Sequence, residues 1–325
     1  MLGFGLCRAA ERRISISGSV RHPLEVTQVM LEKLAAAEVH LNEICTDGEF
    51  RGVFKLLGVP LRDLLSLAGI EKKHTEFDSP VDLAVRVTSS SGQSVVLSWG
   101  ELYYKSTAEV IVATSAHPIF PNKSIDRFKD KDAYHRMMDI LEREIRFPKL
   151  VVPSDRYADR SIEAITAIEV VDRCSDVGAD PSPEPYSPQV TVGGEGRQPV
   201  TFEDFSEGEF ITATIHVVGD GKGYHGTHAY SGIPLKAVIE QARVKADVNT
   251  AFIVSAPDAH RVLVSWGELF LNPHGDRIIL ARKEDGKPIT RNGKFILIPA
   301  DDLMADRQVK SVKRIEAVSM ESGNR

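Results

Sequence analysis

The sequence contains few cysteines: its 325 residues include three, Cys7, Cys45 and Cys174. Because these lie far apart and no CxxC pair occurs, the sequence predicts neither a zinc knuckle nor a disulfide framework. It also has no CxxCH haem-attachment motif and no set of cysteines for an iron–sulfur cluster. Isolated thiols are typical of a reducing compartment, so we expect a cytoplasmic protein, or a periplasmic one if a leader has been removed.

Long apolar runs and an excess of positive charge are also absent. No run approaches the roughly 20 residues of a membrane helix, so no membrane span is predicted. The net charge of −6 argues against nucleic acid as a partner. A hydrophobic fraction of 42% over this length fits about two globular domains.

The sequence has one strong internal repeat. Its two tryptophans, Trp99 and Trp266, occupy the same place in the segments LSWGEL (97–102) and VSWGEL (264–269). In both copies a β-rich run, a polar turn and a second β-rich run precede the tryptophan. This pattern is typical of a hairpin. We therefore interpret the chain as two copies of one module.

The segments around the tryptophans repeat in the same order. Upstream, GVPLRDLLSLAGI from Gly58 matches GIPLKAVIEQARV from Gly232, and each predicts an amphipathic helix with proline in its first turn. Downstream, EVIVAT from Glu109 matches RIILAR from Arg277. These blocks predict an α+β fold, a tandem duplication of a module with a mixed sheet and short helices.

Composition sets the expected domain boundaries. Copy one covers residues 10–173 and copy two residues 199–320, joined by a linker at 174–198 that is rich in proline, glycine and serine. Copy one carries an insertion at 117–147. His117 begins it, and His135 lies in a helix that we predict within it. This helix packs on its own domain, or forms a lid or a partner-binding surface. We expect the copies to contact each other as a pseudo-dimer.

Four segments of copy one, in this order, carry a resemblance to a known family: ISISGSVRHPLEVTQVMLEKL, GVPLRDLL, SGQSVVLSWGEL and LVVPSDRYADRSIEAITAIEVV. Together they resemble the oxidoreductase molybdopterin-binding domain of the sulfite oxidase family. The resemblance implies a molybdenum–molybdopterin cofactor whose metal is bound by a cysteine thiolate. Cys45 stands where this ligand would be, and a soft thiolate suits the metal. Gly48 would allow the backbone to approach the cofactor.

The family also surrounds the pterin phosphate with cationic donors. The residues in the corresponding blocks are Arg51, Lys55, Arg156 and Arg160. The sequence departs from the family because these cations form no dense cluster and because copy two has Gly219 where copy one has Cys45. It also lacks the further dimerisation domain of sulfite oxidases.

Two hypotheses follow from the resemblance and its gaps. The first is a molybdenum-dependent oxidoreductase with its metal site in copy one, which would need a separate electron-transfer partner because the chain has no relay of its own. The second is a non-catalytic binding or assembly subunit that retains the fold without the cofactor and has a protein partner.

Three further groups of residues have competing interpretations. Glycine-rich residues 220–232 form a small-ligand or metal site, or a surface loop that packs on the other copy; the candidates are Tyr224, His225, His228 and Tyr230. Glu101 and Glu268 either act as general acids or, as we favour, begin the helix after each hairpin. Trp99 and Trp266 are predicted to be core residues rather than platforms for a pterin.

Overall fold

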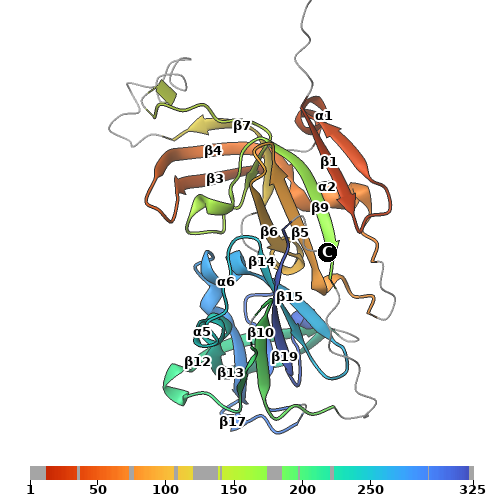
Figure 1. Cartoon of the computed structure of the whole chain (residues 1–325), viewed down its shortest axis with the longest axis vertical. Helices are drawn as coiled ribbons and strands as arrows, with labels where there is room; N and C mark the ends of the chain where they lie inside the picture. The colour runs from red at the N-terminus through yellow and green to blue at the C-terminus, as the bar shows by residue number, and fades with distance from the viewer. Residues whose placement is uncertain are drawn as a thin grey trace, which may run out of the picture.

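A computed structural model describes residues 12–34, 37–72, 77–105, 109–119, 138–139, 141–173, 185–196, 198–219, 223–291 and 293–321. These residues form four sheets and a few short helices, arranged as two stacked halves (Figure 1). The predicted α+β class is therefore confirmed. None of the described helices is both long and apolar enough to cross a membrane.

One five-stranded sheet in each half brings the beginning and the end of that half together. The order is β2-β1-β9-β5-β6 in the first half and β11-β10-β19-β14-β15 in the second. In each sheet the strand that begins the half pairs in parallel with the strand that ends it, β1 with β9 and β10 with β19, while the other pairs are antiparallel. The bounds are β1 Arg13–Gly18, β2 Leu24–Thr27, β5 Leu83–Ser89, β6 Ser94–Ser98, β9 Ile165–Asp172, β10 Val190–Gly194, β11 Val200–Phe202, β14 Thr250–Ser255, β15 Arg261–Ser265 and β19 Arg314–Ser319.

A second, antiparallel sheet in each half carries the candidate site residues. Its order is β3-β4-β7-β8 in the first half, and β12-β13-β16-β17 in the second, where β18 also pairs with β16. The bounds are β3 Ala37–Ile44, β4 Phe50–Pro60, β7 Ile111–Pro118, β8 Lys149–Val151, β12 Ile211–Gly219, β13 Gly223–Pro234, β16 Ile278–Glu284, β17 Lys287–Pro288 and β18 Ile296–Pro299.

The helices begin where the repeated segments predict them. Pro60 and Pro234 are the N-cap residues of the helices Leu61–Ala68 and Leu235–Gln241. They therefore lie one position before the first turn in which we expected them. Trp99 and Trp266 both begin a five-residue helix and stack on the aromatic ring four residues later. The bounds are α1 Gln28–Lys33, α2 Leu61–Ala68, α3 Trp99–Tyr103, α5 Leu235–Gln241 and α6 Trp266–Phe270, with 3₁₀ turns η1 Pro80–Asp82, η3 Ala158–Arg160, η4 Glu207–Glu209, η5 Gly275–Arg277 and η6 Ala305–Arg307.

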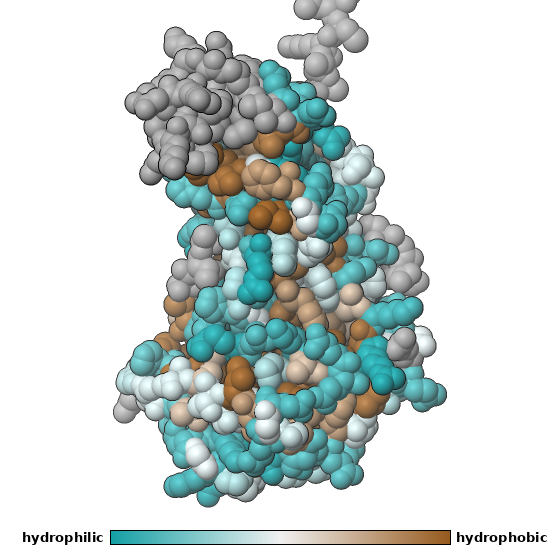
Figure 2. All heavy atoms as spheres, turned by 90° about the vertical axis from the view of Figure 1, so that its left-hand side faces the viewer, coloured by the Kyte–Doolittle hydropathy of each residue, from teal (hydrophilic) through white to brown (hydrophobic). Residues whose placement is uncertain are grey.

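The two halves pack through the faces of their five-stranded sheets, where β5 and β6 approach β14 and β15 (Figure 1). A buried apolar cluster joins them, formed by Ala84, Val96, Ala251, Ile253, Leu263 and Met320. On the face shown in Figure 2, hydrophobic patches are small and lie among hydrophilic residues.

The described residues at the end of the insertion pack on the first half. Most of the helix that we predicted within it, His135 included, lies outside the described residues. Met138, Leu141 and Ile145 belong to the apolar cluster of β3, β4, β7 and β8. Among the residues described, the insertion is thus part of its own domain, as we favoured.

Candidate functional site

Cys45 lies directly after β3, at the tight turn that leads into β4. Its N–H donates to the Glu49 carbonyl at 3.0 Å, and the Gly48 N–H donates to the Cys45 carbonyl at 2.9 Å. Gly48 has a φ of +87°, which glycine adopts without the strain that other residues would feel. The side chain of Cys45 is buried. The position at a strand end agrees with what the resemblance implies.

The surroundings of the Cys45 thiol are acidic. Its sulfur and carboxylate oxygens of Asp47 and Glu49 all lie within 4.8 Å of one another. Asp159 stands nearby, accepting hydrogen bonds from the backbone and hydroxyl of Thr46 at 3.0 and 2.6 Å. Burial raises the pKa of Cys45, these three carboxylates raise it further, and Arg51 opposes them. The environment therefore disfavours the thiolate that a metal would need.

The four cations predicted to bind the pterin phosphate do not converge. Arg51 is paired with Glu49, to which its Nε donates at 2.9 Å. Lys55 pairs with Glu38 at 3.2 Å. Arg156 is exposed, and its backbone N–H donates to the Leu271 carbonyl in the other half.

Side chains of the insertion lie close to Glu49 and Asp159, two of the carboxylates that act on the Cys45 thiol. A hollow of about 380 Å³ remains, lined by Glu49, Arg51, Asp159 and by residues of the insertion. Arg143 reaches across it, donating to Glu43 at 2.8 Å and to the Arg51 carbonyl at 3.2 Å, and pairing with Glu163. A phosphate dianion needs donors that are not already paired. These residues therefore do not fit a molybdopterin cofactor.

Arg160 belongs to a different structure, an ion cluster between the halves. It is fully buried, and it donates to Asp155 at 2.8 Å, to Glu101 at 2.6 Å and to the Ser265 hydroxyl at 3.1 Å. Its guanidinium lies on the backbone of Gly267, where an added Cβ would be 2.2 Å from Cζ. These contacts use the donors that the sequence interpretation assigned to a phosphate.

Arg307 forms the matching cluster from the second half. It donates to Asp302 and Glu268, each at 2.7 Å, and lies on Gly100, where an added Cβ would be 1.9 Å from Cζ. Ser98 of the first half donates to Glu268 at 2.7 Å, as Ser265 of the second donates to Glu101 at 2.6 Å. Although burial opposes it, Arg307 and Lys105 hold the pKa of Glu268 below its ordinary value.

The sequence contained a signal for these clusters. The triplet ADR recurs at 158–160 and 305–307, and in both copies its arginine lies five residues after an aspartate. The glutamates of both SWGE segments recur with it. The predicted helix-start role of the glutamates is confirmed, because Ser98 and Ser265 cap the N–H groups of Glu101 and Glu268. Their second role, as partners of a buried arginine, was missed.

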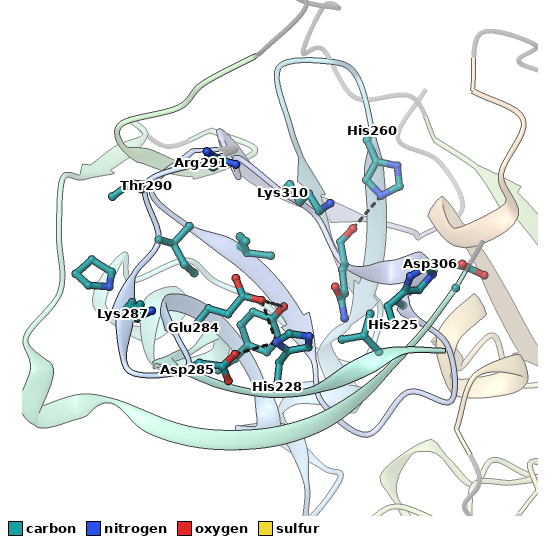
Figure 3. Close-up of a pocket in the computed structure, with 18 of the residues that line it drawn as sticks. His225, His228, His260, Glu284, Asp285, Lys287, Thr290, Arg291, Asp306 and Lys310 are labelled. Atoms are coloured by element: carbon teal, nitrogen blue, oxygen red, sulfur yellow. Dashed lines mark hydrogen bonds and ion pairs between the residues drawn. The ribbon is translucent and has the colours of Figure 1, made fainter. Parts of the chain in front are cut away.

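The second half contains a cavity of about 1280 Å³ (Figure 3). Three of the four residues that we singled out there line it, namely His225, His228 and Tyr230, while Tyr224 instead binds Thr227 through its hydroxyl. The predicted loop is wrong over residues 223–230, which are part of β13. The glycines in this segment favoured a loop over a strand. The segment is nevertheless a strand, because it pairs with β12 along its length.

Several lining residues came from parts of the sequence that showed no motif. They are His260 from the β14–β15 turn, Glu284, Asp285, Lys287 and Arg291 around β17, and Asp306 and Lys310 from the closing segment. His228 Nδ1 lies 2.9 Å from Asp285, and this hydrogen bond raises the pKa of His228 and lowers that of Asp285. Burial lowers the pKa of His260, whose Nε2 is 3.1 Å from the Gln308 carbonyl.

Comparisons with known proteins gave little. No family model matches the chain, and no curated protein matches it. Among solved structures it is similar to the sulfane dehydrogenase SoxCD from Paracoccus pantotrophus, with a TM-score of 0.35 and 13% sequence identity over 93% of this chain and 78% of that one. A likeness this distant leaves the function to be argued from the residues themselves.

Proposed function

We propose that the chain is a non-catalytic binding protein, a tandem duplication of a sulfite-oxidase-like module that has kept the fold without the molybdenum cofactor. Its domains are residues 10–173 and 199–320, with the linker at 174–198. The shared strand order of the two halves supports the duplication. So do the matching contacts between the halves, in which Arg160 lies on Gly267 and Arg307 lies on Gly100. The two halves are in contact through a buried apolar cluster, and such a two-part scaffold suits a subunit that binds a ligand or a protein.

The observation that carries this proposal is that the cations near Cys45 already have carboxylate partners. The pterin phosphate must find unpaired cations, but Arg51 and Arg143 are already bound to carboxylates. Placing a further dianion there would cost several kcal/mol, because an unpaired buried charge loses its hydration.

One observation favours the alternative, a molybdenum-dependent oxidoreductase with a separate electron-transfer partner. Cys45 directly follows β3, and its neighbours Glu49 and Asp159 line a hollow. For a cofactor to enter, Arg143 would have to leave Glu43 and Glu163, and the buried Glu43 would keep only Lys149. Breaking such a buried set costs about 3–5 kcal/mol, which the cofactor would have to offset.

Molybdenum analysis separates the two. Protein purified from a host that makes the cofactor should contain nearly no molybdenum, because the site lacks free donors. Cys45→Ser should leave that content unchanged and shift the free energy of unfolding by only about 1 kcal/mol, the size of a small change in a core. A content close to one molybdenum per chain in the native protein, lost in Cys45→Ser, would establish the oxidoreductase instead.

A further inference from the structure

The cavity of the second half is bounded by strands and by two segments that close over them. One side is the β12–β13 hairpin, and the other is the turn around β17 together with residues 305–310 (Figure 3). Its walls include apolar side chains as well as polar ones, which is the usual composition of a small-molecule site. The apolar residues are Val217, Pro288, Ile289, Ile296 and Ala305.

The carboxylates that line the cavity already have partners in the protein. Each accepts a hydrogen bond: Asp258 from the His260 N–H at 3.0 Å, Glu284 from the Tyr230 hydroxyl at 2.8 Å, Asp285 from the Ala229 N–H at 2.9 Å, and Asp306 from the Tyr104 hydroxyl at 3.0 Å. Asp285 also binds His228. These hydrogen bonds hold the carboxylates in place, and their negative charge remains.

Two of the cations that line the cavity differ from these carboxylates. Arg291 and Lys310 take part in no side-chain hydrogen bond or ion pair with any residue that the structure describes. Both are exposed, and Figure 3 shows them across the cavity from Asp285 and His228. Lys287 stands at the same opening, where its charge helps to lower the pKa of Asp285. Unpaired cations at the mouth of a cavity attract anions.

We propose that this cavity binds a small organic molecule carrying a tetrahedral oxyanion, such as a phosphate or sulfate monoester. Arg291 and Lys310 bind the oxyanion, because a guanidinium donates two parallel hydrogen bonds to such a group and an ammonium adds a point charge. The imidazoles of His225, His228 and His260 face the rest of the molecule. This inference goes beyond the proposed function and does not depend on the absence of molybdenum.

Binding of inorganic phosphate and sulfate tests the site in the full-length protein. We expect saturable shifts of the imidazole resonances of His225, His228 and His260 in NMR spectra, at constant ionic strength set with chloride. Lys310→Gln and Arg291→Gln should each weaken binding about tenfold, the effect of one charge-assisted hydrogen bond. Lys313→Gln is the matched control, since Lys313 is also exposed but does not line the cavity; it should change affinity less than about twofold.

Two outcomes would overturn the proposal. One is that neither phosphate nor sulfate gives saturable shifts. The other is equal weakening by Lys310→Gln and Lys313→Gln, which would mean that the anions only screen the surface charge. Saturation by phosphate but not sulfate, with the expected loss in both cavity variants, would support it and identify the phosphate ester as the source.

The pH dependence of sulfate binding gives a further prediction, since sulfate keeps its charge over the range in which histidine titrates. Asp285 raises the pKa of His228, while Glu284, Tyr230 and His225 also face or adjoin its ring. Below that raised pKa the His228–Asp285 pair is neutral overall, and above it the pair is negative. Affinity for sulfate should therefore fall as the pH rises through the pKa of His228, and His228→Gln should flatten the profile. A wild-type profile that is flat, or unchanged in His228→Gln, would remove His228 from the site.

Discussion

Arg307→Met should lower the free energy of unfolding by about 3–5 kcal/mol, measured by denaturant unfolding, because it leaves two buried carboxylates without their main partner. Glu268 is fully buried and the Asp302 side chain is 2% exposed. Methionine fills much of the volume but donates no hydrogen bond. Arg160→Met should have an effect of the same size, through Asp155 and Glu101.

An exposed ion pair provides the control. Arg62 pairs with Glu109, and both side chains are a third or more exposed, so Arg62→Met should change stability by less than about 1 kcal/mol. Adding Glu268→Gln to Arg307→Met should recover part of the loss, because the amide removes one uncompensated charge. If Arg307→Met cost no more than Arg62→Met, the buried cluster would have no role in holding the halves together.

Gly100→Ala should cost about 2–4 kcal/mol, a large effect for a single methyl group. Its Cβ would be 1.9 Å from Cζ of Arg307, and that guanidinium has no room to give way because Asp302 and Glu268 hold it. Either the carboxylates lose their partner or the halves move apart. Gly267→Ala should act likewise through Arg160, at 2.2 Å. Thermal and denaturant unfolding measure both.

Gly208→Ala is the matched control. Gly208 lies in η4 on the surface, where an added Cβ would meet only the Ser206 hydroxyl, at an ordinary 3.6 Å. A double-mutant cycle tests the cause: in an Arg307→Met background, Gly100→Ala should cost much less than in the native protein, because the clashing group is gone. Fully additive losses would show that the methyl group meets something other than the arginine.

The local features of this fold could be predicted from the sequence, and the long-range contacts could not. The SWGEL segments predicted two hairpins that each lead into a helix, because hydrophobic alternation and an N-terminal glutamate act within a few residues. Arg160 has one partner close in sequence, Asp155, but its other carboxylate partner, Glu101, lies 59 residues away. The local sequence therefore did not show that carboxylates would occupy all of its donors. The chemistry of the guanidinium group predicts that a buried arginine binds an anion, but it does not identify which anion.

The candidate site showed the same limit. Cys45 was found at a strand end, as expected, yet its acidic neighbour Asp159 comes from a segment 113 residues later than Thr46. Arg143, which fills the adjoining space, belongs to an insertion whose packing the sequence left open. In the second half, the sequence drew attention to His228 and Tyr230 but not to Arg291 or Lys310, because single charged residues outside a motif resemble any solvated surface.

The two arginine clusters also bear on the order in which the chain is made. Asp155, Glu101 and Arg160 all belong to the first half, and Asp302, Glu268 and Arg307 to the second. Each half provides the other with a glycine on which the arginine lies, Gly267 or Gly100, and with one serine hydroxyl. Lys105 of the first half also pairs with Glu268 of the second at 2.9 Å. A nascent first half emerging from the ribosome can therefore neutralise its own arginine before the second half has been translated. Docking then forms the ion pairs that cross the contact, Lys105 with Glu268 and Asp82 with Arg261, and excludes the water between the halves.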